Sequence, residues 1–316
     1  MTLRTRLDRA ALSMLAAWMG EHYFRTFRLL DGGNESPSNS QPFDAVLGQR
    51  ELRASVTIGA LWETPAPDAA QFEQLIGGDI GVGAYALWVP PAAALPREEP
   101  QQSAFRLRIA NGMKGLEPGE RREVRLPATL LLAKTDAEGQ YVSVTGALSS
   151  HWTRISEGVS GAFQLDSRAL HRLPEEEAEL ELLLSRVRDR AALLNVEERT
   201  EVDVHDHWLV SRLPADGPAG VTVAGSSPDF DPSDGAALRR LLRGHIRRAV
   251  EQQDAGQCDF SVLLLIASPQ HIEDEMATTA VRGMSPTTYG SLDLIVLVAD
   301  GRVRQVLQPR SLPWGS

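Results

Sequence analysis

Two short apolar runs near the C-terminal end constrain the fold of this chain most strongly. Residues 262–267 and 294–299 contain only apolar side chains. A membrane-spanning helix needs about 20 such residues, so we expect no contact with a membrane. Runs of this length and composition are instead typical of strands. Asp300-Gly301 follows the second run and favours a tight hairpin turn into another strand.

Amphipathic helices are predicted at three places in the chain. Leu7, Ala11, Met14 and Trp18 recur at helical spacing near the N-terminus. Residues 174–194 and 235–253 show the same periodicity, and Pro174 is well placed to open the first of these two helices. We therefore predict an α+β protein.

Prolines and changes in composition divide the chain into three predicted domains. Residues 1–90 form an α/β domain, and a proline-rich linker follows at residues 90–102. Residues 103–213 form a β-rich segment with one long helix, in which residues 105–109, 123–134 and 141–146 have strand composition. Residues 214–316 form an α/β segment with a basic helix. The sequence leaves open whether the last two segments fold as one domain.

Charge and cysteine content bear on compartment and partners. The 316 residues carry a formal charge of −10, which repels nucleic acid at long range, so any contact with DNA or RNA needs a local basic patch. Cys258 is the only cysteine. An intramolecular disulfide is therefore excluded, which fits a reducing compartment, and we expect a cytoplasmic protein.

The first 90 residues are predicted to run helix, three strands, helix, strand. With Asp44 at the start of the second strand and Glu21 at the end of the first helix, this α-β-β-β-α-β order resembles the core of the PD-(D/E)xK (restriction-endonuclease-like) nucleases. The resemblance implies a divalent-metal-dependent hydrolase that uses magnesium, with Asp44 and either Glu21 or Glu51 as metal ligands.

The third strand departs from the nuclease pattern. The resemblance places an acid-x-lysine motif where this chain has Ser55-Val56-Thr57, and neutral hydroxyls cannot replace a metal-binding carboxylate and a cation. Glu51-Leu52-Arg53 offers only a shifted substitute. We therefore favour a pseudoenzyme that has kept a nuclease-like fold, with no cofactor.

Basic residues concentrate in the helix predicted at residues 235–253. Arg239, Arg243 and Arg247 recur every four residues and so share one face, and Arg240 and Arg248 lie beside them. Guanidinium groups on an exposed helix face can bind phosphate oxygens bidentately. They can equally remain solvated, or pair with acidic residues such as those at positions 175–181.

A second candidate site lies on the strand predicted at residues 202–213. Alternation along a strand places Asp203, His205 and His207 on one face. Two imidazoles and a carboxylate can bind one metal ion, although exposed polar residues of a strand show the same pattern.

Two functional hypotheses follow from the sequence. The first is a non-catalytic binding or assembly subunit that has a protein partner and uses the arginine helix to contact nucleic acid or an acidic partner. The second is a metal-dependent nuclease that uses Asp44 with Glu21 or Glu51. The sequence does not indicate an oligomeric state.

Overall fold

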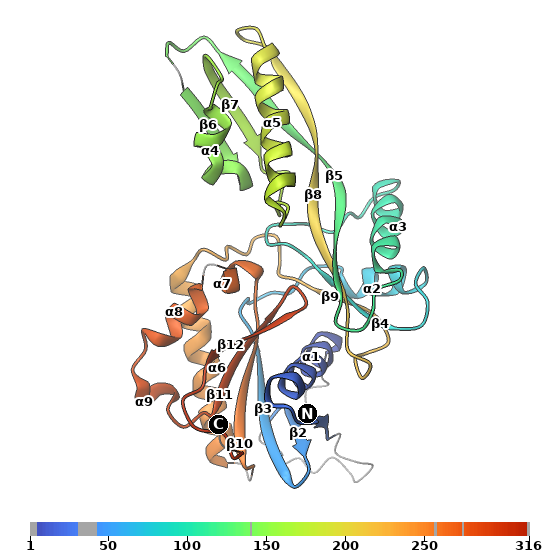
Figure 1. Ribbon diagram of the computed structural model, residues 1–316, viewed down its shortest axis with the longest axis vertical. Helices are drawn as coiled ribbons and strands as arrows, with labels where there is room; N and C mark the ends of the chain where they lie inside the picture. The colour runs from blue at the N-terminus through green and yellow to red at the C-terminus, as the bar shows by residue number, and fades with distance from the viewer. Residues whose placement is uncertain (1–4, 31–42, 140, 256–257, 274, 315–316) are drawn as a thin grey trace. The chain divides into compact units, whose positions relative to one another are not determined.

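The computed structural model describes residues 5–30, 43–139, 141–255, 258–273 and 275–314. The chain forms two compact units (Figure 1). The first unit combines residues 1–122 with residues 209–316, and the second comprises residues 123–208. Helices and strands are interspersed along the chain, which confirms the predicted α+β class.

A mixed six-stranded sheet forms the centre of the first unit. Its strand order is β1-β2-β3-β10-β11-β12. Strands β2 and β3 form an antiparallel hairpin, and β3, β10 and β11 run parallel. Strand β12 returns antiparallel to β11 after the turn at Asp300-Gly301, as the sequence predicts. The strands are β1 (Arg28–Leu29), β2 (Ala45–Gln49), β3 (Leu52–Ala60), β10 (Phe260–Ile266), β11 (Leu294–Ala299) and β12 (Arg302–Leu307).

Helices cover both faces of this sheet. Helix α1 (Arg6–Tyr23) packs on the face that carries Val262 and Leu264, and α6 (Gly235–Ala255) packs on the face that carries Leu263 and Leu265. Three short helices, α7 (Pro269–Glu273), α8 (Met276–Arg282) and α9 (Pro286–Tyr289), lie on the α6 side (Figure 1). Both faces of β10 and β11 are buried, which explains why these strands consist of apolar residues apart from Ser261.

The six elements predicted for residues 1–90 occur in the predicted order, but they do not share one sheet. Helix α2 (Ala69–Gly77) and β4 (Ala84–Trp88) complete that order. Strand β4 pairs with β8 (Arg199–Arg212) and β9 (Gly220–Ala224) in a second sheet of order β6-β7-β5-β8-β4-β9. The strand that pairs with β3 in parallel is β10, which places Phe260 opposite Ala54.

Residues 105–109 were predicted as a strand, and that prediction is wrong, because they lie in helix α3 (Gln101–Met113). The buried residues of α3 are Phe105, Ile109, Ala110 and Met113, which is helical spacing. Leu107 would share a strand face with Phe105 and Ile109, but it is 52% exposed. Residues 101 and 102, predicted to belong to the linker, also lie in α3.

The second unit packs helices against its part of the second sheet. Strands β5 (Arg121–Thr135) and β8 cross the boundary between the units, while β6 (Tyr141–Gly146) and β7 (Ala162–Ser167) belong to the second unit alone. Helix α5 (Glu177–Leu193) buries Leu180, Leu184 and Val187 in its core. Helix α4 (Trp152–Ser156) contributes Ile155.

None of the helices in the described part of the chain combines the length and the apolar composition that crossing a bilayer requires.

Candidate functional site

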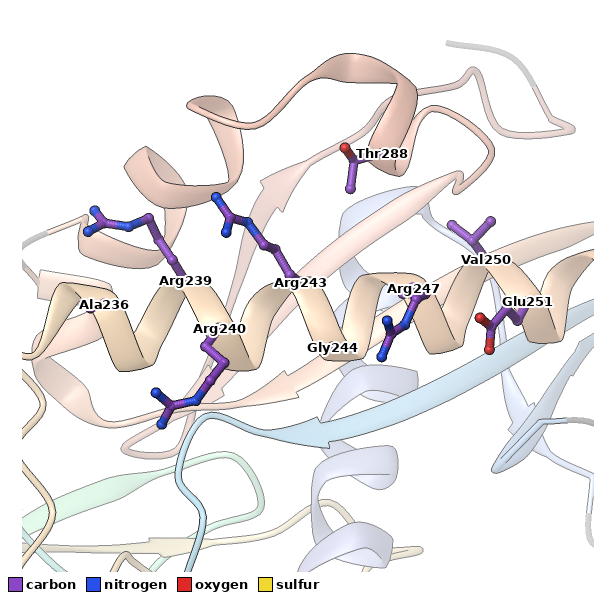
Figure 2. Close-up of a pocket in the computed structure, with 9 residues that line it drawn as sticks. All are labelled: Ala236, Arg239, Arg240, Arg243, Gly244, Arg247, Val250, Glu251 and Thr288. Carbon is purple, nitrogen blue, oxygen red and sulfur yellow. The ribbon is translucent and has the colours of Figure 1, made fainter.

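The exposed side of α6 carries three arginines, Arg239, Arg243 and Arg247, which we call the arginine face. They line a surface depression of about 810 Å³ together with Val250, Glu251 and Thr288 of α9, among other residues. In Figure 2, Arg239 and Arg243 extend on the same side of α6 as Thr288, and Arg240 extends from the opposite side. The predicted helix is confirmed and the three arginines are exposed, but the Arg247 side chain extends away from Thr288 in Figure 2.

The sequence of α6 explains why these arginines face solvent. Leu238, Leu242, Ile246 and Ala249 are buried against β10 and β11, so the arginines between them lie on the outer side. Asp234 caps the helix, because its Oδ1 accepts the N–H groups of Ala237 and Ala236 at 3.0 and 2.9 Å. These two hydrogen bonds lower the pKa of the Asp234 carboxyl below its usual value.

The five arginines of α6 have different environments. Arg240 forms an ion pair with Glu63 at 2.7 Å, and Arg248 forms one with Asp44 at 3.0 Å. Arg239 interacts electrostatically with the capping carboxylate at the start of the helix. For Arg243 and Arg247, the described residues provide no ion pair and no hydrogen bond to the guanidinium group.

Four of the five acidic residues at positions 175–181, namely Glu175, Glu177, Glu179 and Glu181, have basic partners within the second unit. Glu179 pairs with Arg125, and Glu181 pairs with Arg188 and with Arg154, the latter at 2.6 Å. Glu175 pairs with Arg172 at 2.9 Å. Most of the negative charge at this helix start is therefore already paired with arginines of the same unit.

Asp44 lies directly before β2 and beside α6. Its Oδ2 accepts the Ile58 N–H at 2.7 Å and the Arg248 guanidinium at 3.0 Å. Arg248 also donates to the Ile58 carbonyl. A cation of the protein therefore already pairs with the carboxylate that was predicted to bind a metal under the nuclease hypothesis.

The hydroxyls of Ser55 and Thr57, where the nuclease resemblance implies an acid-x-lysine motif, form hydrogen bonds with α6. Thr57 Oγ1 donates to Gln252 Oε1 at 2.5 Å, and Ser55 Oγ donates to Gln253 Oε1 at 3.0 Å. Both hydroxyl-bearing residues are buried, at 3% and 4% exposure. This side of β3 is thus closed by hydroxyl–amide hydrogen bonds and carries no charged group at these two positions.

Next along the same side of β3, a glycine allows a close approach of α6. A Cβ on Gly59 would lie 2.4 Å from His245 Nδ1. The imidazole Nε2 of His245 lies 2.8 Å from the Ala60 carbonyl oxygen, to which an N–H at this position donates. Burial lowers the pKa of His245. The neutral ring therefore acts as a packing element between α6 and β3.

The structure does not bring the three predicted nuclease carboxylates together. Glu51 lies in the turn after β2, beyond the Gln49–Leu52 pair, whereas Asp44 precedes the other end of that strand. Five residues of strand separate them by roughly 16 Å. Glu21 is exposed in the last turn of α1. Within the described ranges, these three residues do not form a group with the spacing of metal ligands.

The three residues predicted to bind a metal on β8 also differ in exposure and in their partners. Asp203 and His205 are exposed, and His207 is 4% exposed. Asp203 accepts a hydrogen bond from Thr129 at 3.3 Å. His207 Nδ1 instead lies 2.9 Å from Glu123 Oε2.

The one group of three metal-type ligands in the described residues consists of Glu123, Glu179 and His207, whose ligand atoms lie within 4.8 Å of one another. The alternation along the strand indicates the histidine but neither glutamate. They come from β5 and α5, and only the pairing of β5 with β8 and the packing of α5 reveal their proximity.

Comparisons of this chain with protein-family models, with curated proteins and with solved structures found no match.

Proposed function

We propose that this chain is a non-catalytic binding subunit that contacts the phosphate backbone of nucleic acid through the arginine face of α6. One observation carries the proposal. Arg243 and Arg247 are exposed at a surface depression, and no described residue pairs with their guanidinium groups, although the chain has a formal charge of −10.

The geometry of the helix suits a polyanion. Arg239, Arg243 and Arg247 are four residues apart, so their Cα atoms are offset by about 6 Å along the helix axis, and their long side chains can turn toward a shared ligand. Each guanidinium can donate two parallel hydrogen bonds to a phosphate. Contacts to phosphates do not distinguish one base from another, so we expect binding with weak sequence preference.

Charge elsewhere in the chain limits the affinity. The overall negative field opposes association, and Glu251 lies at one end of the depression. Three phosphate contacts would give binding that is strongest at low salt. A weak, salt-sensitive contact suits a subunit that adds to the affinity of a larger complex.

The surroundings of Asp44 support binding without cleavage. Its carboxylate is paired with Arg248, and the neighbouring acid-x-lysine positions carry neutral hydroxyls bonded to glutamines. A magnesium ion there would have to displace the Arg248 guanidinium group from the carboxylate that would bind it.

The order of elements around this position supports a nuclease-like ancestry. Helix α1, the strands β1-β2-β3, helix α6 and strand β10 repeat the α-β-β-β-α-β order within one sheet and its two covering layers. In this proposal, α6 and β10 take the places that the sequence suggested for α2 and β4. Residues 61–234 then form a long insertion between β3 and α6.

A charge-reversal pair tests the proposal. The test variant changes Arg239, Arg243 and Arg247 to glutamate. The control variant changes three exposed arginines on other elements in the same way, namely Arg28 of β1, Arg108 of α3 and Arg190 of α5. Both variants change the formal charge equally, so a nonspecific effect of net charge lowers binding in both.

We expect fluorescence anisotropy with labelled single- and double-stranded oligonucleotides at 50 mM salt to detect binding by the unmodified protein and by the control variant, and loss of binding in the test variant. Equal binding by the two variants, or no binding by the unmodified protein, would refute the proposal. Capture of an acidic protein through the same arginines would point to an assembly role instead. Cleavage of the oligonucleotide with magnesium, abolished by Asp44→Asn, would refute the non-catalytic role.

A further inference from the structure

We infer that Glu123, Glu179 and His207 form a binding site in the second unit for a transition-metal dication such as Zn²⁺. The site is independent of the arginine face, which lies in the first unit. It differs from the metal triad that the sequence suggests, because it keeps only His207 of that triad.

Three different elements supply the ligands. Glu123 lies near the start of β5, His207 near the end of β8, and Glu179 in the first turn of α5. The three ligand atoms already lie within 4.8 Å of one another. Around a tetrahedral zinc ion with bonds of 2.0–2.1 Å, ligand atoms lie about 3.3 Å apart. The 2.9 Å contact between His207 Nδ1 and Glu123 Oε2 is therefore near that spacing. A rotation of the Glu179 side chain would bring its carboxylate oxygen to a similar distance from the other two ligand atoms.

The chemistry of the three ligands selects the class of metal. One imidazole nitrogen and two carboxylate oxygens suit zinc and its first-row neighbours, whereas magnesium and calcium prefer oxygen ligands alone. Three protein ligands leave a fourth tetrahedral position for water or an external ligand. The side chain of His207 is 5% exposed, that of Glu123 22% and that of Glu179 27%. The histidine is therefore buried, while the two partly exposed carboxylates leave a path by which an ion can enter from solvent.

Neighbouring groups hold two of the ligands in place. The Glu175 N–H donates to Glu123 Oε1 at 2.9 Å, which leaves Oε2 toward the histidine. The backbone N–H of His207 donates to the Arg172 carbonyl at 3.2 Å. The first hydrogen bond orients a ligating carboxylate, as such bonds do in metal sites, and the second fixes the backbone that carries the histidine.

An arginine competes for the third ligand. Arg125 pairs with Glu179 Oε1, but a carboxylate has two oxygens, so Glu179 can keep this ion pair and offer Oε2 to the metal. The Arg125 side chain is 58% exposed, so it can also turn into solvent when an ion binds.

Bound metal would connect the start of α5 to β5 and β8. These contacts would be absent in the unfolded chain, so metal should stabilise the second unit against unfolding. The site therefore predicts both a binding signal and a stability signal.

The experiment measures Zn²⁺ binding to the full chain without a histidine tag, by calorimetry, and Co²⁺ binding by visible absorption. We expect one site per chain and tetrahedral Co²⁺ bands. Glu179→Gln keeps the size of the side chain and removes its charge, and it should weaken Zn²⁺ binding at least about tenfold. His207→Gln and Glu123→Gln should do the same.

The matched control is the double variant Asp203→Asn/His205→Ala, which changes the exposed neighbours on the same strand and should bind Zn²⁺ like the unmodified protein. If His207→Gln does not fold, Glu179→Gln alone decides, because that residue is only partly buried. Three results would overturn the inference: no one-to-one binding by the unmodified chain, unchanged binding by Glu179→Gln, or loss of binding in the Asp203/His205 control.

Discussion

The close packing of α6 on β3 at Gly59 makes a sharp prediction. In the unmodified protein, Gly59→Ala should lower the free energy of unfolding. The added Cβ would lie 2.4–2.7 Å from three atoms of the His245 ring, so the ring must move and its hydrogen bond to the Ala60 carbonyl breaks. Overpacking costs about 1–3 kcal/mol and the lost hydrogen bond about 1 kcal/mol. Replacing a strand glycine returns about 0.5–1 kcal/mol of chain entropy. The expected net loss is about 2 kcal/mol.

The effect of Gly59→Ala on the free energy of unfolding should become neutral or favourable when the His245 ring is absent. His245→Ala alone should cost about 1–2 kcal/mol through the lost hydrogen bond and packing. In that background, Gly59→Ala meets no ring and should be neutral or stabilising by about 0.5–1 kcal/mol. Urea denaturation of the four proteins completes a double-mutant cycle with an expected coupling of about 2–3 kcal/mol. An equal effect of Gly59→Ala in both backgrounds would refute this account of the α6–β3 contact.

Three further predictions concern the first unit. Burial lowers the pKa of both His245 and His271, so the unfolded chain binds protons that the folded one does not. Stability from these residues is complete above the unfolded-state pKa of about 6.5 and is lost as pH falls toward the lower folded-state values. Urea denaturation should therefore give a lower free energy of unfolding at pH 5.5 than at pH 7.5. This difference should be smaller in a His245→Gln/His271→Gln variant. Leu264→Ala removes a fully buried side chain from β10 and should cost about 2–5 kcal/mol by urea denaturation, whereas a loss below about 1 kcal/mol would contradict the central position of that strand. Asp44→Ala leaves the Ile58 N–H without its side-chain acceptor and should lower the free energy of unfolding by about 1–3 kcal/mol. Asp44→Asn keeps an acceptor oxygen and should lower it less, and equal losses in the two variants would contradict this role of Asp44.

Local sequence patterns predicted much of the secondary structure. The arginine spacing of α6 and the apolar runs of β10 and β11 depend on the periodicity of single elements, and the structure contains those elements. Local patterns did not predict helix α3, because the alternation of Phe105, Leu107 and Ile109 is also typical of a strand. Only burial distinguishes the exposed Leu107 from its two neighbours.

Contacts between distant segments were not predictable from these patterns. Strand β10 pairs with β3 across about 200 residues of chain, and nothing in Phe260–Ile266 or Leu52–Ala60 specifies that partner. The sequence likewise gives no sign that Arg248 pairs with Asp44.

The candidate metal site shows the same limit. His207 was identified from the alternation of one strand, which can only suggest neighbours two residues away. Its actual carboxylate neighbours, Glu123 and Glu179, are 84 and 28 positions away in sequence. Their proximity depends on the pairing of β5 with β8 and on the way α5 packs, both of which are tertiary features.

The most direct test of the central claim is the salt dependence of nucleic-acid binding. Each phosphate contact contributes about 0.7–0.9 to the slope of log K against log salt concentration, so three arginines predict a slope of about −2 to −3. Changing Arg239, Arg243 and Arg247 to glutamine should bring the slope close to zero, and Arg243→Gln alone should reduce its magnitude by about one contact. A slope that is unchanged in the triple variant would show that nucleic acid binds elsewhere and would contradict the proposed role of α6.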